Sequence, residues 1–452
     1  MNLPSSVSDL IARLRDAGYP AYAVGGCVRD ALLGRTPHDW DLCTSATPEE
    51  MKQVFAGEHV VETGIKHGTL TVVRDHIPYE VTSFRTEGPY SDHRHPDSVA
   101  FVTDIREDLS RRDFTINAMA YSPDEGLVDL FGGQDDLAGG IVRCVGKPEE
   151  RFREDALRIL RALRFASTFG FALEADTARA VHLLAPTLRL VAAERIRVEL
   201  LKMLCGPAVG RILREYPDVL AVIIPDLAGM PGYDQLNHHH RFDLWEHTVQ
   251  AVENIPPEED LRLTMLLHDT GKPASQTIDE KGEAHYRGHQ AISADIARRV
   301  TEHLHCDRDQ QERVTRLVMY HDIPLRTQDG APATDRRFLL HRLHQFGERD
   351  LRALFQIHRA DRIATGITSR EREDERMRQR MDALDAVLRE QPCFTLKDLA
   401  VNGHDLMALG LRGQEIGKAL NRLLSYVMDG KLPNERTALL SALQHQVSDE
   451  ED

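Results

Sequence analysis

The sequence contains no uninterrupted apolar run close to the roughly 20 residues that a membrane-spanning helix needs. It also has no C-x-x-C pair, and its six cysteines are scattered along 452 residues, at positions 27, 43, 144, 205, 306 and 393. These absences argue against a disulfide-stapled secreted scaffold and against a zinc knuckle. The first 20 residues lack a basic stretch followed by an apolar core. We therefore expect no secretory signal, a cytoplasmic location and no membrane partner.

Positive charge is scarce as well, because 56 lysines and arginines face 72 acids, which gives a formal net charge of −16. A chain with this balance is a poor non-specific binder of nucleic acids, whose binding comes from neutralised phosphates. The charge is unevenly distributed, however: between Arg143 and Arg164 seven basic residues face four acids. The overall charge thus weakens the case for an RNA partner without excluding one.

The length of the chain indicates several domains. Residues 1–140 alternate helical and strand-like segments, which predicts an α/β head. Beyond residue 150 the apolar spacing becomes helical and stays so. Breaks that contain Gly or Pro then predict a helical neck at 141–205, a helical body at 206–390 and a helical tail at 391–452.

The stretch VGGCVRDALLGRTPHDWDLCTSAT, which starts at Val24, combines two features that suit phosphate chemistry. Gly25 and Gly26 separate a predicted strand from a predicted helix, and the backbone N–H groups of such a turn form an anion site. Asp39 and Asp41 follow in an extended segment, where the i, i+2 spacing puts both carboxylates on one face. Such a pair suits Mg²⁺, which prefers few carboxylates plus substrate oxygens. A glycine turn with solvated acids is the simpler alternative for the stretch taken alone.

This stretch resembles the signature of nucleotidyltransferases of the DNA polymerase β type, specifically the class II tRNA nucleotidyltransferases, or CCA-adding enzymes. The family pattern GG-x-VRD, LLG and D-x-D is present as Gly25, Gly26, Val28, Arg29, Asp30, Leu32, Leu33, Gly34, Asp39 and Asp41. The resemblance implies that Asp39 and Asp41 are the catalytic acids and hold Mg²⁺. It also implies that Gly25, Gly26 and Arg29 bind the triphosphate. Glu80 is a candidate third carboxylate, with a solvated strand acid as the alternative.

Later segments match the same family in order. RRDFTINAMAY supplies Arg112 and Asp113. The resemblance implies that this segment binds the nucleotide, with Asp113 accepting a hydrogen bond from the ribose 2′-hydroxyl. An Arg–Asp pair that holds the head against the next domain is the alternative. Residues 85–99 look like the flexible loop of the family. CC-only members lack part of this loop, so its presence argues against CC-only addition, while A-only addition stays open.

The segment EDALR at 154–158 offers a way to select a base. Asp155 and Arg158 are spaced i, i+3, which predicts one shared helix face. Cytosine and adenine each present an amino donor beside a ring-nitrogen acceptor, so Asp155 can accept from the amino group while Arg158 donates to the ring. Uracil and guanine reverse this order. The simpler alternative is an ordinary ion pair. The resemblance favours selection, because the family places E-D-x-x-R here, and we add Arg161 to the predicted nucleotide-binding residues.

The second half of the chain carries histidines and acids that suit a hydrolytic transition-metal site. Their order, H…HD…H…H…D, resembles that of the HD phosphohydrolase domain. The metal ligands that this resemblance implies are His247, His268, Asp269, His289, His321 and Asp361. A vestigial site with a purely structural role is the alternative.

The last portion of the chain resembles the C-terminal region of bacterial CCA-adding enzymes, which binds the tRNA elbow. This implies phosphate contacts from Lys418, Arg422, Lys431 and Arg436, with solvated helix surface as the alternative.

Taken together, the sequence predicts a polymerase β-type α/β head followed by an all-α neck, body with an HD domain, and tail. The predicted activity is CCA addition to the tRNA 3′ end from CTP and ATP, with tRNA as partner. The alternatives are A-only addition, an HD phosphohydrolase acting on RNA ends, and a tRNA-binding protein without chemistry. The sequence leaves the oligomeric state open.

Overall fold

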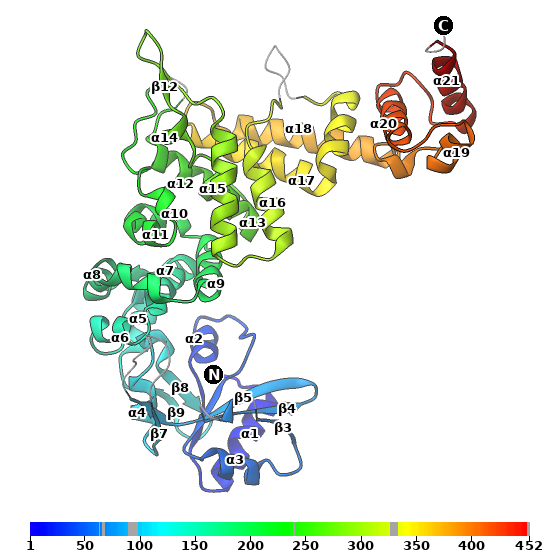
Figure 1. Cartoon of the computed structure of the whole chain (residues 1–452). Helices are drawn as coiled ribbons and strands as arrows, with labels where there is room; N and C mark the ends of the chain where they lie inside the picture. The colour runs from blue at the N-terminus through cyan, green and yellow to red at the C-terminus, as the bar shows by residue number, and fades with distance from the viewer. Residues whose placement is uncertain (63, 66–67, 89–97, 238–239, 326–332, 450–452) are drawn as a thin grey trace. The chain divides into compact units, whose positions relative to one another are not determined.

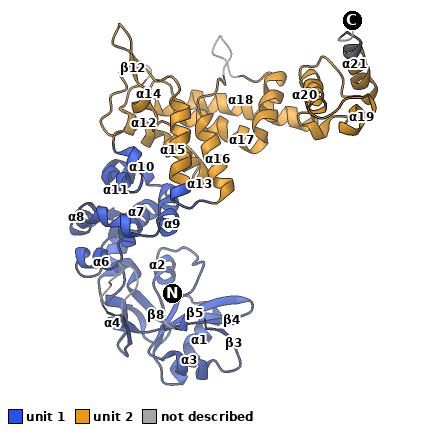
Figure 2. Ribbon diagram, in the orientation of Figure 1, with its two compact units in different colours: residues 1–228, 302–306 blue, residues 229–301, 307–452 orange. Residues whose placement is uncertain are grey.

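The computed structural model describes the chain except for residues 63, 66–67, 89–97, 238–239, 326–332 and 450–452 (Figure 1). The described chain forms two compact units, coloured separately in Figure 2. Unit 1 comprises residues 1–228 with 302–306, and unit 2 comprises residues 229–301 with 307–452. The finer division into head, neck, body and tail stays a prediction.

The N-terminal part of unit 1 is built on a seven-stranded mixed sheet with the strand order β3-β4-β5-β2-β1-β8-β9. Within this sheet β2 and β5 pair in parallel, and the other neighbouring strands pair antiparallel. The strands are β1 (Ala21–Val24), β2 (Leu42–Thr44), β3 (His59–Val61), β4 (Thr69–Arg74), β5 (Ile77–Ser83), β8 (Met119–Ser122) and β9 (Gly126–Asp129). A separate hairpin pairs β6 (Arg85–Glu87) with β7 (Val99–Phe101).

The interior strand β1 is buried on both faces, because all four of its residues are apolar and buried. Successive side chains of a strand point to opposite faces. Ala21 and Ala23 accordingly pack in one core cluster with residues of α1 (Ser5–Asp16) and α3 (Pro48–Val54). Tyr22 and Val24 pack in a second cluster with Leu109 of α4 (Ile105–Ser110). The end of β1 is thereby held rigidly where the predicted site begins.

The remaining part of unit 1 is largely helical. Its helices are α2 (Gly26–Leu32), α5 (Gly133–Gly139), α6 (Pro148–Glu154), α7 (Leu157–Phe169), α8 (Ala175–Leu184), α9 (Ala193–Leu204), α10 (Val209–Glu215) and α11 (Pro217–Ile223), with 3₁₀ turns η2 (Thr115–Asn117), η3 (Ala185–Leu190) and η4 (Pro225–Leu227). The long helices α7 and α9 pack closely against each other. A two-residue parallel pair, β10 (Ile141–Val142) with β11 (Ala172–Leu173), lies between the helices in sequence.

Unit 2 is a helical assembly in which α12 and α18 both pack against the long helix α17 (Figure 1). Its helices are α12 (Leu244–Glu253), α13 (Glu259–Leu267), α14 (Lys272–Ser275), α15 (His289–His303), α16 (Arg308–Met319), α17 (Arg336–Ala364), α18 (Arg370–Arg389), α19 (Gly403–Ala408), α20 (Gln414–Met428) and α21 (Arg436–Asp449), with the 3₁₀ turn η5 (Leu396–Asp398). Helix α17 is kinked at Gly347, whose φ of 73° is not helical.

The predicted α/β head and largely helical remainder are confirmed. The term all-α needs one correction, because β10–β11 and a second short pair, β12 (Thr277–Ile278) with β13 (Ala284–His285), interrupt the helices. Two-residue strands are too short to give a periodic signal in sequence. Among the described residues, no helix combines the length and the apolar character needed to cross a bilayer.

Candidate active site

The turn between β1 and α2 requires glycine at position 25. Gly25 has a φ of 81°, in the region that residues with a Cβ rarely adopt. A Cβ placed there would lie 3.0 Å from a terminal nitrogen of Arg112. The N–H of Gly25 is already used, since it donates to the carbonyl of Met119 over 3.1 Å. The close approach brings a guanidinium to the predicted phosphate turn.

Arg112 is well placed to receive an anion. Its Nη2 donates to the buried carboxylate of Asp108 over 3.2 Å, which fixes the side chain. Its Nε is buried and makes no hydrogen bond in the described structure. A buried donor without an acceptor is costly, and an oxygen of a bound phosphate would remove that cost. The sequence predicted Arg112 as a nucleotide ligand, and its placement beside Gly25 suits that role.

The carboxylates of Asp39, Asp41 and Glu80 occupy neighbouring strands or their ends. Asp41 directly precedes β2, and its carbonyl accepts the N–H of Val24 over 2.9 Å, which ties it to the end of β1. Glu80 lies on β5, beside Asp41, because Leu42 pairs with Val81. Partial removal from solvent and the charge of Glu80 raise the pKa of Asp41, while Arg112 opposes this effect.

This gathering of like charges is the feature that fits a divalent cation, because a cation would relieve the repulsion that raises the pKa of Asp41. The three acids are not drawn tightly together, however. Among the described residues, two groups of side chains have all their possible ligand atoms within 4.8 Å of one another. Both groups lie in unit 2. Divalent metal ions are the cofactor that nucleotidyltransferases of this fold generally use, and the head carboxylates offer oxygen ligands for them.

Arg29, a predicted triphosphate ligand, is packed inside unit 1. Its Nη1 donates to Asn117 Oδ1 over 2.6 Å, and its Nε donates to Asp30 over 2.9 Å. The guanidinium also lies 5.1 Å from the ring centroid of Phe165 and 4.8 Å from that of Phe169, both on α7. Only 8% of Arg29 is exposed, and its side-chain contacts join α2 to η2 and α7. Its predicted role in triphosphate binding stays a prediction.

Asp113, the predicted reader of the ribose, is likewise engaged. Its Oδ1 accepts hydrogen bonds from the backbone N–H of Phe114 and from Asn117 Nδ2, over 2.9 and 3.1 Å. Its Oδ2 accepts from Nε of Arg161 over 2.8 Å. Burial raises the pKa of Asp113, but Arg161, Arg158 and Asn117 outweigh it and hold the pKa at about 2. The Arg–Asp pair named as the alternative to ribose reading is therefore present, with Arg161 as its cation.

The base-selecting pair differs from the prediction in its local structure. Asp155 and Arg158 do not share one helix: α6 ends at Glu154, and Asp155 is extended, with φ −139° and ψ 104°. The expected helix fails because Asp155 Oδ1 accepts the N–H of Leu157 over 3.0 Å and so caps the start of α7. The two residues remain linked, since the Arg158 N–H donates to the Asp155 carbonyl over 3.0 Å.

Arg158 is held in place while keeping free donors. Its Nη1 donates to Glu154 over 2.7 Å and to the carbonyl of Arg151 over 3.3 Å. Its Nη2 donates to the carbonyl of Arg111 over 3.2 Å. A guanidinium has five N–H donors. Two of the five therefore have no partner in the described structure, one on Nε and one on Nη2, and are available to a base.

Helix α9 supplies two residues that the sequence did not single out. Arg195 forms a two-point ion pair with Asp155, with nitrogen–oxygen distances of 2.8 and 3.3 Å. Glu199, one turn later, is buried and pairs with Arg161 and Arg164 of α7. The i, i+4 spacing of Arg195 and Glu199 predicts a shared helix face. No spacing in the sequence connects that face to Asp155, which lies 40 residues earlier.

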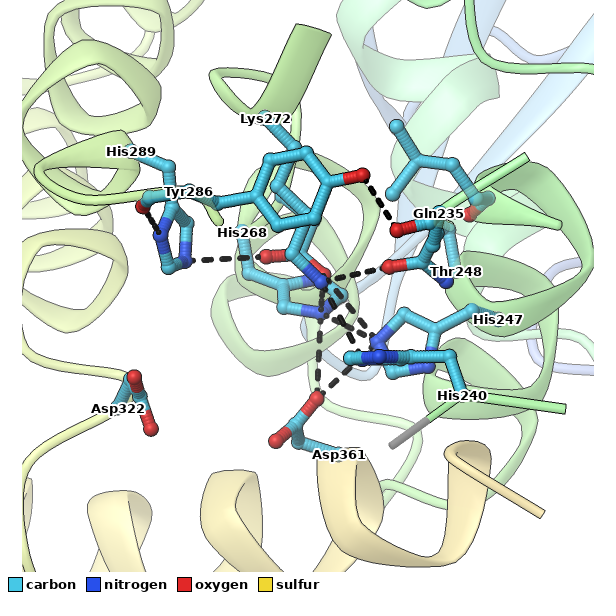
Figure 3. A network of polar contacts seen from close by, with 12 residues as sticks. Gln235, His240, His247, Thr248, His268, Lys272, Tyr286, His289, Asp322 and Asp361 are labelled. Carbon is cyan, nitrogen blue, oxygen red and sulfur yellow. Dashed lines mark hydrogen bonds and ion pairs between the residues drawn. The ribbon is translucent and has the colours of Figure 1, made fainter. Parts of the chain in front are cut away.

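Unit 2 brings together all six of the predicted HD residues. One group consists of His247 on α12, His268 and Asp269 after α13, and Asp361 on α17 (Figure 3). The Nε2 atom of His247 lies 3.2 Å from Asp269 Oδ2 and 3.1 Å from Asp361 Oδ1. The Nε2 atom of His268 lies 3.2 and 3.6 Å from the same two oxygens. Two imidazoles thus face two carboxylates in a protein interior.

A second group shares one member with the first, because His289 and His321 approach the other oxygen of Asp269. Their Nε2 atoms lie 3.3 and 3.6 Å from Asp269 Oδ1 and 3.2 Å from each other. The two carboxylate oxygens of Asp269 therefore face different histidine pairs. Asp269 is 1% exposed, and neither oxygen has a hydrogen bond of good geometry. A buried carboxylate whose oxygens face imidazole nitrogens without a completed hydrogen bond fits a metal-binding role.

The orientation of three of these imidazoles is fixed in the same way. The Nδ1 atoms of His268, His289 and His321 each donate to the backbone carbonyl three residues earlier, over 2.7 to 2.8 Å. Because a carbonyl can only accept, each Nδ1 carries a proton, and Nε2 is the ring nitrogen that a metal ion would bind. Second contacts of this kind orient metal-ligating histidines. The donor set of nitrogen and oxygen atoms therefore fits a transition metal.

A lysine also enters this cluster. Lys272 Nζ lies 2.7 Å from Asp269 Oδ2 and 2.9 Å from Gln235 Oε1 (Figure 3). His240 Nε2 lies 3.4 Å from the same ammonium, and burial and then Lys272 lower the pKa of His240 to about 3. The neighbouring histidines at 238–239 lie outside the described residues. The centre of the predicted loop 85–99 lies outside them too.

The four predicted RNA-binding residues of the tail fall into two kinds. Lys431 pairs with Asp429 over 3.0 Å, and Arg436 pairs with Asp405 over 2.6 Å. Lys418 and Arg422 lie one turn apart on α20, both exposed, and neither takes part in an ion pair within the described chain. The first two cations are partly neutralised, whereas the second two present uncompensated charge.

The seven-stranded mixed sheet with its glycine turn and carboxylates defines a nucleotidyltransferase head. Three family models match the chain: the "Poly A polymerase head domain" over residues 21–143, a model for the RNA and SrmB-binding site of polymerase A over 170–229, and a model for domain 2 of tRNA nucleotidyltransferases over 291–443.

Curated relatives narrow this class. The chain is 36% identical over 437 residues to the CCA-adding enzyme of Levilactobacillus brevis, covering 96% of each chain. It is 34% identical over 443 residues to that of Lactobacillus helveticus, covering 96% of this chain and 95% of the relative. The chain belongs to the family of CCA-adding enzymes.

Solved structures agree with this assignment. The Bacillus stearothermophilus CCA-adding enzyme in complex with CTP superimposes with a TM-score of 0.74 at 30% identity, over 100% of this chain and 99% of the other. The Thermotoga maritima enzyme complexed with tRNA shares the fold, with a TM-score of 0.59 at 21% identity, over 98% and 95%.

Proposed function

We propose that this protein adds C, C and A in sequence to the 3′ end of tRNA, using CTP and ATP and no nucleic-acid template. The observation that carries the proposal is the junction of the sheet with α6 and α7. There the glycine turn, Arg112 and the carboxylates of Asp39 and Asp41 belong to the same unit as Asp155 and Arg158. The first set of residues suits phosphate chemistry, and Asp155 and Arg158 suit the selection of a base. A-only addition remains the alternative within the family.

The head residues handle the triphosphate and the reacting hydroxyl. In the reaction the tRNA 3′-oxygen bonds to the α-phosphorus, and the bond from that phosphorus to the pyrophosphate oxygen breaks. Asp39 and Asp41 would hold Mg²⁺, which stabilises the charge that develops on both oxygens. Arg112 contributes positive charge through a guanidinium whose Nη1 lies beside Gly25, and it keeps one buried Nε–H without a partner in the described structure.

The residues at the α6–α7 junction choose the base. Asp155 Oδ2 accepts one recorded hydrogen bond, from Arg195, and retains a lone pair for the amino group of cytosine or adenine. Arg158 retains two donors for the ring nitrogen. Uracil and guanine would set a carbonyl against the carboxylate and an N–H against the guanidinium. A bidentate contact of this kind discriminates by about 1–3 kcal/mol.

The carboxylate Asp41 provides the sharpest test of the head. Asp41→Asn removes a charge without changing shape, and we expect extension of a tRNA that lacks its CCA end to fall by more than about 100-fold, as for other groups that stabilise developing charge. The matched control is Asp124→Asn, because Asp124 is an exposed acid of the same unit that pairs with Arg15 of α1. Equal activity of the two variants would contradict the assignment.

A second activity is supported by the histidine cluster of unit 2. We propose that His247, His268, Asp269, His289, His321 and Asp361 bind a transition metal and hydrolyse phosphate esters at RNA ends. The metal supplies an activated water when bound. The protein provides oriented imidazole Nε2 atoms, the shared acid Asp269, and the ammonium of Lys272 as a partner for phosphate charge.

Separate variants distinguish the two activities. Asp269→Ala should abolish metal uptake and release of phosphate from 2′- or cyclic-phosphate RNA ends, and leave tRNA extension unchanged. Asp41→Asn should do the opposite. Phosphate release that survives Asp269→Ala would contradict the hydrolase proposal, and loss of both activities in either variant would point to one site or to unfolding.

The partners and the location follow from the activity. We propose that residues 391–452 bind the tRNA elbow, with Lys418 and Arg422 as the main phosphate contacts. We also propose a cytoplasmic location, where the six cysteines, none of which forms a disulfide in the structure, would stay reduced. The division into a head at 1–140, a neck at 141–205, a body at 206–390 and this tail is kept as a proposal.

A further inference from the structure

A buried lysine points into the histidine cluster of unit 2 (Figure 3). Lys272, the first residue of α14, is 5% exposed, and its Nζ lies 2.7 Å from Oδ2 of Asp269. The same oxygen lies 3.2 Å from Nε2 of His247 and 3.2 Å from Nε2 of His268. An ion bound between these imidazoles and Asp361 would use Asp269 as a ligand through this oxygen. The ammonium therefore contacts an atom that the metal ion would also need.

Two neutral acceptors hold the ammonium from its other side. Oε1 of Gln235 lies 2.9 Å from Nζ, and the Nε2 of Gln235 donates to the carbonyl of Phe242 over 3.2 Å, which fixes the amide. Nε2 of His240 lies 3.4 Å from Nζ. Because the pKa of His240 is about 3, its ring is neutral, and its Nδ1 faces Oδ1 of Asn237 over 2.9 Å. Nδ1 therefore carries the proton, and Nε2 accepts from the ammonium.

The contact of Lys272 with Asp269 is of another kind. Oδ2 of Asp269 has no hydrogen bond of good geometry, although the ammonium lies 2.7 Å away. The attraction between opposite charges therefore holds this contact, whereas oriented hydrogen bonds hold the contacts with Gln235 and His240. A competing cation can break an ion pair of this kind without disturbing the other two contacts.

The ammonium supplies charge that the cluster needs when no metal is bound. Asp269 is 1% exposed, and a second carboxylate, that of Asp361, faces the same two imidazoles. Buried carboxylates without a compensating charge are costly, and Lys272 offsets part of that cost. A divalent ion would compensate the same carboxylates, but it would repel an ammonium at the shared oxygen. The metal ion and the ammonium are therefore alternatives at Oδ2 of Asp269.

We propose that Lys272 is a resident counter-cation of the histidine cluster, which stabilises the metal-free protein and which a metal ion displaces from Asp269. The inference rests on the proposed function, in which the six cluster residues bind a transition metal. After displacement the ammonium keeps its contacts with Gln235 and His240, and its remaining N–H is free. Metal binding thereby prepares the cation that the proposed hydrolysis uses as a partner for phosphate.

The test compares the metal affinity of full-length, chelator-treated proteins. Co²⁺ bound by histidine is followed by its visible absorption, with excess Mg²⁺ present to fill sites that offer oxygen ligands alone. Lys272→Met removes the charge and keeps a long, flexible side chain, so we expect its Kd for Co²⁺ to fall by at least about tenfold. Lys272→Arg keeps the charge, and its Kd should stay within about threefold of the wild-type value. Lys281→Met is the matched control, because Lys281 is an exposed lysine of the same unit.

Thermal unfolding provides a second measurement of the same competition. In chelator, Lys272→Met should unfold at a lower Tm than the wild type, because Asp269 loses its counter-charge. Added Co²⁺ should then raise the Tm of this variant by more than it raises that of the wild type, since tighter binding to the folded state stabilises it more. A Lys272→Met protein that is unfolded in chelator should refold with Co²⁺, and failure to refold would overturn the inference.

The remaining outcomes separate this inference from the proposed metal site. Unchanged or weaker Co²⁺ binding by Lys272→Met would overturn the role of Lys272 while the metal site stands. Equal tightening in Lys272→Arg would also overturn it, because the charge would then not be the cause. Absence of histidine-bound Co²⁺ in the wild-type protein would contradict the metal site itself, and the inference would fall with it.

Discussion

Arg161 on α7 donates from Nε to Oδ2 of Asp113 over 2.8 Å, and its Nη2 lies 2.7 Å from the same oxygen. The segment that is predicted to bind the ribose is thus joined by a charged pair to α7, the helix that follows Asp155 and contains Arg158. Any motion of α7 relative to this segment would have to stretch that pair, which makes it a structural link as well as a candidate nucleotide contact.

This link predicts a dependence of stability on pH. Although burial alone would raise it, the pKa of Asp113 is held at about 2, below the usual 3.8, by Arg161 and its other partners. A lowered pKa contributes stability that is present above pH 4 and is lost as the pH falls towards 2. Urea unfolding should show the wild-type protein on the order of 2 kcal/mol more stable than Asp113→Asn at pH 5. This difference in the free energy of unfolding should be smaller at pH 3. A difference that does not change with pH would contradict the low pKa of Asp113.

Arg29 should matter for stability as well as for any role in substrate binding. Arg29→Ala leaves the buried Asn117 without its donor and removes stacking on Phe165 and Phe169, so we expect a loss of about 2 kcal/mol in the free energy of unfolding. Arg35→Ala is the control, since Arg35 also lies over Phe169 but is exposed. Thermal unfolding of both variants checks this, and a midpoint for Arg29→Ala equal to that of the control would show that the buried contacts contribute little.

The histidine cluster predicts stabilisation of unit 2 by metal. Ligand binding to the folded state alone stabilises it, by about 2.7 kcal/mol at 100 times the dissociation constant. After treatment with a chelator, added Mn²⁺ or Co²⁺ should raise the Tm of the wild-type protein by several degrees and leave that of Asp269→Ala unchanged. His303→Ala, on α15 but outside both ligand groups, should respond like the wild type. A metal response that persists in Asp269→Ala would place the ion elsewhere.

The dependence of tRNA binding on salt should show which basic residues of the tail contact phosphate groups. The variant Lys418→Ala with Arg422→Ala removes two unpaired charges, whereas Lys431→Ala with Arg436→Ala removes two that are already paired with acids. We expect the first variant to weaken tRNA binding and to reduce the slope of log K against log salt by somewhat less than 2. The second should change the slope less. Filter binding from 50 to 200 mM salt measures both, and equal slopes for the two variants would contradict the distinction.

The features predicted correctly from sequence are those that neighbouring residues determine. A strand that ends in Gly25-Gly26 and an acid pair two residues apart are local patterns, and the structure places them at the end of β1 and before β2. The break between α6 and α7 is different. EDALR has good helix formers, and its unwinding at Asp155 combines two contacts. The cap on the N–H of Leu157 is local and typical of aspartate, whereas the ion pair with Arg195, 40 residues away, is contained in no local propensity.

The histidine cluster shows the same limit. The order of its six residues indicated one site, and the structure brings all six together. The sequence could not indicate that Asp269 faces two histidine pairs, because that depends on how α12, α15, α16 and α17 pack around α13. The partners of Arg29 and Arg436 escaped prediction for the same reason.

The most direct test of the account uses purified protein, Mg²⁺ and three tRNA transcripts that end at the discriminator base, in C and in CC. Each transcript receives CTP, ATP, both, or UTP with GTP, and products are resolved at single-nucleotide length. The account predicts that the shortest transcript grows by C, C and A and then stops, with negligible use of UTP and GTP. Extension of the CC-ended transcript alone would make the protein an A-adding enzyme, and no extension of any transcript would contradict the transferase assignment.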